Sequence, residues 1–265
     1  MESTSPKPWA LITGAASGLG LDLAKQMAAH YQLVLVDVQE EALTREATSL
    51  ECQHYFVCDL AVPGEIDTMV QLIAQRQITL SVLINNAGIT HRSLASHTQL
   101  SVIEKVMRVN YFAPVQLTQA LTPFLSHHAC VVNISSMAGW MPVLGRAGYC
   151  ASKSALHQYF ETLRAEWQGN GKHILMVYPS FLDTPIEHNA LNGLGNKATH
   201  RRTMVGAMGN SRDMASQIIS AMNRGQQRLL PDGFTRVSAL LYRLMPKVYL
   251  YLMRRRLMRE LDTPQ

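Results

Sequence analysis

A tyrosine and a lysine stand four residues apart in a segment whose pattern indicates a helix. The segment RAGYCASKSALHQYFETLRAEW holds Tyr149 and Lys153, and a spacing of four places both side chains on one helical face. A nearby cation favours the phenolate, so we expect Lys153 to lower the pKa of Tyr149 from its usual value of about 10. Such a phenol can donate or accept a proton near neutral pH. Two such residues are often merely solvated, so the catalytic interpretation requires partners elsewhere in the chain.

A glycine-rich turn follows the first apolar segment and opens a helical pattern. In LITGAASGLGLDLAKQM, the glycines Gly14, Gly18 and Gly20 permit a tight turn and close approach of the backbone to a pyrophosphate at the helix N-terminus. Such a turn alone is a weak indicator. Asp37 ends the second apolar segment, where a carboxylate can accept hydrogen bonds from an adenosine ribose. The combination predicts a dinucleotide site.

Asp37 also predicts which dinucleotide is bound. Its carboxylate would repel the 2′-phosphate of NADP(H), and neither Val38 nor the turn residues Ala15, Ala16 and Ser17 supply a compensating cation. NAD(H) is therefore favoured over NADP(H). In the alternative interpretation, Asp37 is only a turn residue at a strand end.

Short apolar segments alternate with helical patterns, which predicts a parallel sheet covered by helices on both faces, a doubly wound α/β fold. The apolar segments are WALIT, QLVLVD, HYFVCD, SVLINN, CVVNIS and HILMVY, with a last one near QQRLLP, and the helical patterns fall near 18–30, 39–50, 63–76, 98–126, 147–168 and 212–224. We expect one domain over residues 1–235, with an Asn- and Gly-rich lid at about 186–211, and a separate extension over 236–265.

The composition suits one soluble domain with a large core, because 47% of the 265 residues are hydrophobic and 16% are charged. The start MESTSPKPWALITG lacks an apolar leader, and no uninterrupted apolar run is long enough to span a bilayer, so we expect a cytoplasmic protein. The four cysteines form no CxxC pair and are expected to be reduced thiols. The histidine and cysteine spacing gives no reason to expect a metal site.

Five motifs stand in the order and spacing typical of one enzyme family. They are TGAASGLG, CDL at 58–60, NNAG at 85–88, NISS at 133–136 and YCASK at 149–153. Over roughly residues 8–231 the chain resembles the classical short-chain dehydrogenases/reductases. The resemblance implies a Rossmann-type domain with about seven parallel strands, and hydride transfer between a nicotinamide and an alcohol or carbonyl carbon.

The resemblance also implies a catalytic tetrad. Tyr149 would be the acid or base, and Lys153 would lower its pKa and bind the nicotinamide ribose. Ser136, with Ser135 as its structural neighbour, would hold the substrate oxygen, and Asn110 would order a water in a proton relay. The alternatives are a helix cap for Ser136 and a helix kink for Asn110.

The cofactor contacts implied by the resemblance extend from the first turn to the sixth strand. Asp59 would lie near adenine, Asn85 and Gly88 would form the turn beside the nucleotide, and Thr184 would meet the carboxamide. After Pro179 the chain has Ser180 where the family usually has glycine. The full expected set is Gly14, Ser17, Gly18, Leu19, Gly20, Asp37, Asp59, Leu60, Asn86, Ala87, Gly88, Tyr149, Lys153, Pro179 and Thr184.

An apolar segment, MAGWMPVLGRAG, lies between Ser136 and Tyr149. It contributes Met137, Trp140, Met141, Val143 and Leu144. With the lid at 186–211, it predicts a bulky apolar alcohol or ketone substrate, steroid-, retinoid- or lipid-like. Alternatively, Met141 and Val143 are simply core residues.

Two alternative functions remain open for the whole protein. They are a 3-oxoacyl-carrier-protein reductase, which would prefer NADP(H), and a non-catalytic nucleotide-sensing or scaffold protein.

The net charge of +5 comes from the C-terminal extension. Seven basic and no acidic residues occur between Arg236 and Arg259, so the remainder has 17 basic and 19 acidic residues, and nucleic-acid binding is not expected. Val237, Leu240, Leu241 and Leu244 follow helical spacing up to Pro246, after which a second helix is expected. Such helices suit an anionic membrane surface or packing against a neighbouring subunit. We expect a homodimer or homotetramer.

Overall fold

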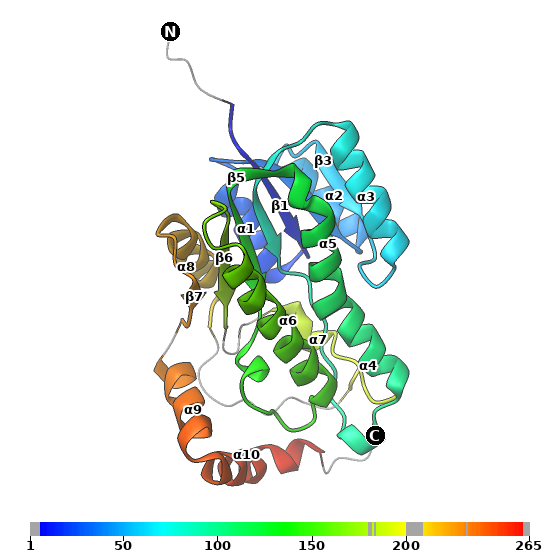
Figure 1. Ribbon diagram of the computed structural model, residues 1–265. Helices are drawn as coiled ribbons and strands as arrows, with labels where there is room; N and C mark the ends of the chain where they lie inside the picture. The colour runs from blue at the N-terminus through cyan, green and yellow to red at the C-terminus, as the bar shows by residue number, and fades with distance from the viewer. Residues whose placement is uncertain (1–5, 180–181, 183, 200–208, 232, 262–265) are drawn as a thin grey trace.

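The computed structural model describes residues 6–179, 182, 184–199, 209–231 and 233–261, which form an α/β domain followed by a pair of helices (Figure 1). Its sheet has seven parallel strands in the order β3-β2-β1-β4-β5-β6-β7. The strands are β1 (Trp9–Thr13), β2 (Gln32–Asp37), β3 (His54–Val57), β4 (Leu80–Asn85), β5 (Leu125–Ile134), β6 (His173–Val177) and β7 (Arg228–Leu229). The predicted doubly wound fold is confirmed, and the strand order reverses between β1 and β4.

Helices cover both faces of the sheet (Figure 1). They are α1 (Gly18–Met27), α2 (Glu40–Ser49), α3 (Pro63–Gln75), α4 (Leu100–Met107), α5 (Ala113–Leu121), α6 (Ala147–Glu166), α7 (Pro185–His188), α8 (Ser211–Asn223), α9 (Gly233–Leu244) and α10 (Pro246–Leu261), with 3₁₀ turns at Ala95–His97, Thr122–Phe124 and Met137–Gly139. One face is packed by α1, α2 and α8, and the other by α3, α5 and α6.

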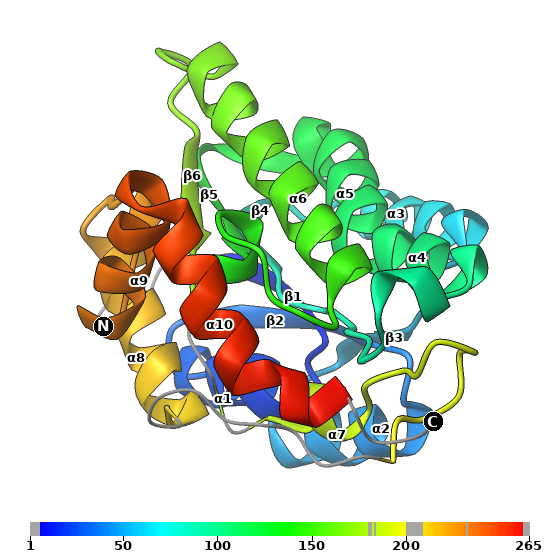
Figure 2. The same cartoon turned by 90° about the horizontal axis from the view of Figure 1, so that it is seen from below.

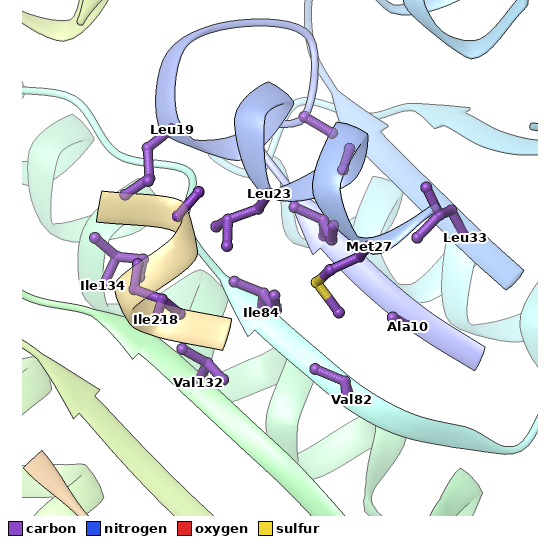
Figure 3. Close-up of a cluster of buried hydrophobic side chains, with 14 of the residues drawn as sticks. Ala10, Leu19, Leu23, Met27, Leu33, Val82, Ile84, Val132, Ile134 and Ile218 are labelled. Atoms are coloured by element: carbon purple, nitrogen blue, oxygen red, sulfur yellow. The ribbon is translucent and has the colours of Figure 1, made fainter. Parts of the chain in front are cut away.

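Strand residues alternate between these two layers, because successive side chains of a strand point to opposite faces. Within β1, Ala10 and Ile12 belong to the cluster under α1 and α8, whereas Leu11 belongs to the cluster under α3, α5 and α6. Figure 3 shows the first cluster, in which Leu23 and Met27 of α1 and Ile218 of α8 pack onto the strands. Burial on both faces explains why the strands read as continuous apolar segments.

The long helix predicted for residues 98–126 is interrupted. It consists of α4, a π-helical turn at Arg108–Phe112, and α5, and β5 already begins at Leu125. A π-turn contains an extra residue per turn, which shifts the direction of the side chains around it. Asn110, at the centre of this turn, is fully buried.

The C-terminal pair of helices, α9 and α10, lies at the end of the molecule toward which the strands point. In the view from below, α10 crosses the middle of the molecule (Figure 2). The predicted break at Pro246 is present, because α9 ends at Leu244 and α10 begins at Pro246. Tyr242 and Tyr249 join the two helices through an edge-to-face ring contact, with ring centroids 5.2 Å apart.

Candidate active site

The first turns of α6 present Tyr149 and Lys153 toward the loop after β5. Their spacing places the Lys153 ammonium 5.9 Å from the centre of the Tyr149 ring. Lys153 is buried, and its Nζ donates a hydrogen bond of 2.7 Å to the Ile134 carbonyl at the end of β5. An ammonium has three donors, so this bond fixes the side chain and leaves donors for another ligand.

Ser136 faces Tyr149 from the end of β5. The serine has an extended backbone and begins the 3₁₀ turn Met137–Gly139, where its Oγ accepts a hydrogen bond from the Ala138 amide at 3.2 Å. The same side chain is hydrogen-bonded to Tyr149. Ser136 is therefore both a cap, as the alternative interpretation held, and a neighbour of the phenol.

Asn110 supports this pair from behind. Its amide exchanges two hydrogen bonds of 2.9 Å with the backbone of Ile89, and its Nδ2 lies 3.0 Å from the Ser152 hydroxyl on α6. A Cβ atom on Gly88 would lie 3.3 Å from Asn110 Oδ1 and 3.7 Å from Lys153 Nζ. The π-turn thus connects the loop after β4 to α6.

The pKa of Tyr149 moves in the direction opposite to the one expected from the sequence. Burial raises it to about 12, and the nearby carboxylate of Glu187 adds to the rise. The hydrogen bond from Ser136 and the charge of Arg146 lower it by less. Burial also lowers the pKa of Lys153 to about 8. Desolvation disfavours the charged form of both groups, so in this structure Tyr149 is a protonated donor at neutral pH.

The glycine-rich turn packs against the end of β4. Gly14 and Gly18 have φ of +66° and +52°, a region that side-chain-bearing residues rarely adopt. A Cβ atom on Gly20 would collide with the Gly14 carbonyl oxygen, so this glycine lets α1 begin directly against the turn. Asn86 ties the turn to β4, because its Nδ2 donates to the carbonyls of Thr13 (2.9 Å) and Gly14 (3.2 Å).

Two carboxylates border the turn. Asp37 is buried at the end of β2, and its two oxygens accept 3.0 Å hydrogen bonds from the amides of Ala16 and Gln39. Each oxygen retains acceptor capacity. Asp59 follows β3 and accepts from the Ala61 amide at 2.9 Å. Both positions agree with a site for an adenosine.

These elements enclose one cavity of about 980 Å³. The predicted residues that line it are Ser136, Tyr149, Lys153, Gly14, Ser17, Gly18, Leu19, Asp37, Asp59, Leu60, Asn86, Ala87, Gly88, Pro179 and Thr184. Gly20 and Asn110 do not line the cavity but contact the segments that do. Asn85 is different: its side chain donates to Asn133 (2.8 Å) and Thr118 (3.3 Å) inside the fold, and it is not part of the cavity wall. The expectation that its backbone borders the nucleotide stays a prediction.

The apolar segment after Ser136 contributes both to the hydrophobic core and to the cavity wall, the two alternatives given by the sequence. Met137 and Met141 are part of the core, and together with Val143 they also line the cavity. Trp140 instead packs against Tyr178, with ring centroids 4.2 Å apart.

His91 was not identified from the sequence. It is fully buried, and the Gly148 amide in the first turn of α6 donates to its Nε2 at 2.9 Å. Helix-initial amides lack intrahelical partners, so His91 satisfies one of them beside Tyr149. Thr98 Oγ1 donates to the Leu94 carbonyl (2.7 Å) and lies 2.7 Å from Ser93 Oγ, which lies 3.1 Å from His91 Nδ1.

This chain of contacts sets the protonation of His91. Since Thr98 uses its proton on a carbonyl, Ser93 donates to Thr98 and accepts from His91, which assigns the imidazole proton to Nδ1. Burial, with a contribution from the charge of Arg146, lowers the pKa of His91 to about 4. The side chain is thus a neutral acceptor for the Gly148 amide.

A partly buried ion pair joins α7 to the start of α6. Arg146 and Glu187 approach to 3.5 Å, and Arg92 donates to the Glu187 carbonyl at 2.8 Å. Both partners of the ion pair line the cavity. They are 41 positions apart in the sequence, and no local pattern marks their contact.

Part of the predicted lid at 186–211 lies within the described residues. Leu191 pairs with the loop after β4, since its amide donates to the Thr90 carbonyl (2.9 Å) and its carbonyl accepts from the Arg92 amide (2.7 Å). Ile186, Glu187 and Asn189 line the cavity. Residues 200–208 of the lid, and Ser180, lie outside the described residues.

The C-terminal helical pair supplies the remaining wall. Val237, Ser238 and Leu241 of α9 and Tyr249, Leu252 and Met253 of α10 line the cavity. The Tyr249 hydroxyl donates to the Pro142 carbonyl at 3.1 Å, which connects α10 to the apolar segment after Ser136. The sequence pattern indicated these helices but gave no sign that they face the site.

The arrangement fits a dinucleotide followed by a second, apolar ligand. Glycines leave room for a backbone approach at the N-terminus of α1, Asp37 offers acceptors at one end, and Lys153 offers donors at the other. The proton-donating phenol of Tyr149 lines the same cavity as the apolar wall of α9 and α10. The geometry suits proton transfer to a polarised oxygen of a bound ligand.

Comparisons with known proteins agree with this geometry. The sequence profile of the short-chain dehydrogenase family matches residues 8–194, which include all four tetrad positions. Dehydrogenase/reductase SDR family member 7B of Rattus norvegicus is 33% identical over 266 residues, covering 94% of this chain and 81% of that protein.

Solved structures share the fold. A short-chain dehydrogenase from Streptomyces avermitilis superposes with a TM-score of 0.76 at 25% identity, covering 98% of this chain and all of that one. A short-chain dehydrogenase/reductase from Burkholderia phymatum in complex with NAD gives a TM-score of 0.74 at 22% identity, covering 98% of each chain.

Proposed function

Since this chain belongs to the short-chain dehydrogenase/reductase family of NAD(P)-dependent oxidoreductases, which act on CH–OH groups, we propose that it interconverts a secondary alcohol and a ketone on a bulky apolar substrate, with NAD(H) as its cofactor. One observation carries the proposal. The proton-donating Tyr149, the carboxylate of Asp37 and an apolar wall border the same cavity.

When bound, a nicotinamide cofactor would supply the hydride for the carbonyl carbon in the reduction direction and would take it up in the oxidation direction. In reduction, Tyr149 would donate its proton to the carbonyl oxygen, and Ser136 would hold that oxygen by a hydrogen bond. The pKa of about 12 keeps Tyr149 protonated for this step. In the reverse direction, Tyr149 accepts the hydroxyl proton as a phenolate. Lys153, with a pKa of about 8, is largely cationic at pH 7 and favours that phenolate.

Asn110 would contribute indirectly, by positioning the backbone near Lys153. Its amide is committed to Ile89 and Ser152, so its contribution is to hold the π-turn and Gly88 beside Lys153.

The preference for NAD(H) is supported by the surroundings of Asp37. Beside it along the cavity wall are Val38 and Gln39, which carry no positive charge. A 2′-phosphate would be repelled by the carboxylate, whereas ribose hydroxyls can donate to it. A 3-oxoacyl-carrier-protein reductase, the alternative function, would be expected to prefer NADP(H).

Titration calorimetry with both cofactors tests this preference. The unmodified protein should bind NADH more tightly than NADPH, and Asp37→Ala should shrink the ratio of the two dissociation constants about tenfold, because charge-assisted hydrogen bonds contribute about 1.5–3 kcal/mol. Asp37→Asn keeps an acceptor but not the charge, so its ratio of dissociation constants should lie between those of the unmodified protein and Asp37→Ala. Tighter NADPH binding by the unmodified protein would exclude the NAD(H) assignment and favour the carrier-linked alternative.

The substrate class is tested by oxidation assays with NAD over a panel of steroid, retinoid and aliphatic secondary alcohols. We expect the highest kcat/KM for the bulky apolar members, because the apolar side chains of Met137, Met141, Val143, Leu241 and Leu252 line the cavity. A preference for short polar alcohols would refute the substrate proposal.

A further inference from the structure

The outer face of the C-terminal helical pair exposes an unusual number of large apolar side chains. Among the described residues, fifteen large apolar side chains are exposed, and eight of them lie between residues 237 and 252. They are Val237, Leu240, Leu244, Met245, Val248, Leu250, Tyr251 and Leu252. Scattered exposed apolar residues are normal, whereas a contiguous group of this size indicates an interaction surface.

The same surface is cationic. Its basic residues Arg236, Arg243, Lys247, Arg254 and Arg255 are all exposed. No aspartate or glutamate occurs between residues 236 and 259. The rest of the chain has two more acidic than basic residues, so this surface differs from the body in both charge and hydrophobicity.

On α9 the two properties are arranged in a definite order. Leu240, Leu244 and Val237 stand at helical spacing on the outward side, and Arg236 and Arg243 flank them along one edge. The opposite side of α9 packs inward through Ala239 and Tyr242. A helix that lies in a membrane interface has this order, with apolar side chains down and arginines at the level of the phosphates.

The apolar surface continues into the cavity. Val237 and Leu252 are 66% and 44% exposed and yet belong to the cavity wall. They therefore mark a rim at which the outer surface of α9 and α10 meets the interior of the site. Figure 2 looks toward α10 from this side of the molecule.

We propose that the outer face of α9 and α10 docks on an anionic lipid surface, with this rim at the interface, so that an apolar substrate passes between the bilayer and the cavity without crossing water. The docking itself is independent of hydride transfer, and only the route of the substrate depends on the proposed function. The proposed contact lies along the lipid surface. Within the described residues, no helix is long and apolar enough to cross a membrane.

Charge favours a lipid surface over a second copy of this chain. A two-fold contact would place the same exposed cations of both copies against each other, with no acidic residue in the span to separate them. Anionic headgroups neutralise these cations, and each basic residue near such a surface contributes about a fivefold gain in affinity (about 1 kcal/mol). The leucines then enter the headgroup region.

Co-sedimentation of the full chain with vesicles tests the proposal. We expect binding to phosphatidylcholine vesicles containing about a third phosphatidylserine, weak binding to pure phosphatidylcholine, and loss of binding at high salt, because salt screens the headgroup charge. Leu240→Ser/Leu244→Ser should weaken binding at least about tenfold, because two leucines no longer enter the bilayer.

The control pair is Leu100→Ser/Leu194→Ser. These leucines are exposed to the same degree, 68% and 63% against 56% and 66%, but lie outside the C-terminal helical pair. The control should bind vesicles as the unmodified protein does. Equal weakening by both pairs would show that docking does not involve α9 in particular, and would overturn the proposal.

A charge series separates the electrostatic part. Arg243→Gln/Lys247→Gln/Arg254→Gln should lower binding about 100-fold at low salt, from a factor of about five for each cation. Arg212→Gln/Arg224→Gln, which neutralises exposed arginines at the two ends of α8, should have little effect. Binding that is unaffected by either series, or that does not depend on phosphatidylserine, would overturn the proposal.

Sedimentation velocity without lipid identifies another occupant of the surface. The mass of Leu240→Ser/Leu244→Ser should equal that of the unmodified protein, and a lower mass would mean that a second copy covers the surface, contrary to the proposal. Neither leucine lines the cavity, so NADH binding and turnover of a soluble substrate should be unchanged. Loss of docking is thereby distinguishable from a failure of the proposed function.

Discussion

The first turn of α6 and the C-terminal helical pair border the same cavity but are held in place by different means. Around α6, buried polar groups bond to one another: Gly148 to His91, Lys153 to Ile134, and Asn110 to Ile89. The helical pair is attached through half-buried aromatic side chains and the hydroxyl of Tyr249, and it exposes leucines on its outer side.

The difference follows from what each wall must do. Proton transfer requires a donor at hydrogen-bonding distance from its target, held to within about 0.5 Å of the productive position, and buried hydrogen-bond networks can provide this precision. An apolar wall recognises its ligand by contact area, which tolerates small movements. Changes at α6 should therefore act on kcat, and changes in the helical pair should act on KM.

The largest effect is expected from Tyr149→Phe. Removing the transferable proton should lower kcat by about 10²–10⁴-fold, the usual contribution of a general acid, and the dissociation constant of NADH should change little. The measurement is steady-state turnover beside fluorescence titration of NADH. A variant that keeps near-normal kcat with an identified substrate would show that another group supplies the proton.

His91→Gln should lower kcat about tenfold without altering NADH affinity, because His91 contacts the backbone of α6 rather than a ligand. The burial of His91 also predicts that the stability of the folded protein depends on pH. The folded pKa of about 4 lies below the usual 6.5, so the unfolded chain binds a proton that the folded protein excludes, and stability falls as the pH decreases from about 6.5 toward 4.

The loss of stability from His91 should reach about 3 kcal/mol at pH 4, from 1.36 kcal/mol per pKa unit. Denaturant unfolding at several pH values measures it, and the difference between the unmodified protein and His91→Gln isolates this side chain from other histidines. Parallel stability profiles for the two proteins would contradict the assigned role.

Leu241→Ala tests the other wall. The side chain lines the cavity, so its truncation should raise KM for an apolar substrate about fivefold, the loss of about 1 kcal/mol of apolar contact, while kcat stays the same. Leu240→Ala is the matched control, because the neighbouring side chain points outward and is not part of the wall. A fall in kcat for Leu241→Ala would remove the distinction between the two walls.

The smallest effect is expected from Tyr249→Phe. It removes the bond between α10 and the Pro142 carbonyl, and the free energy of unfolding should decrease by about 1 kcal/mol. Thermal unfolding measures this change in stability. In steady-state assays, the factor by which KM rises should be small, and the factor by which kcat falls should be smaller still. A loss of stability as large as that of a core truncation would mean that α10 is as firmly built in as α6.

Local patterns in the sequence were sufficient for the framework. Apolar segments ending at Thr13 and Asp37 predicted β1 and β2 with their observed bounds, and Leu240, Leu244 and Pro246 predicted the boundary between α9 and α10. Patterns of this kind are reliable because helix and strand geometry fixes which residues of a segment share a face. The helix predicted for residues 98–126 shows the limit of such prediction, because the extra residue of the π-turn at Arg108–Phe112 does not change the local sequence pattern.

The sequence by itself determined the fold class, the family and the residue types that could carry out proton and hydride chemistry, because these depend on short-range spacing. Only the tertiary structure decided which groups meet across long separations: His91 with Gly148, 57 positions apart, and Tyr249 with Pro142, 107 positions apart. It also decided the direction of the Tyr149 pKa, since spacing reveals the nearby lysine but not the burial that raises the pKa. Desolvation is a property of the whole packed molecule, and no segment of the chain encodes it alone.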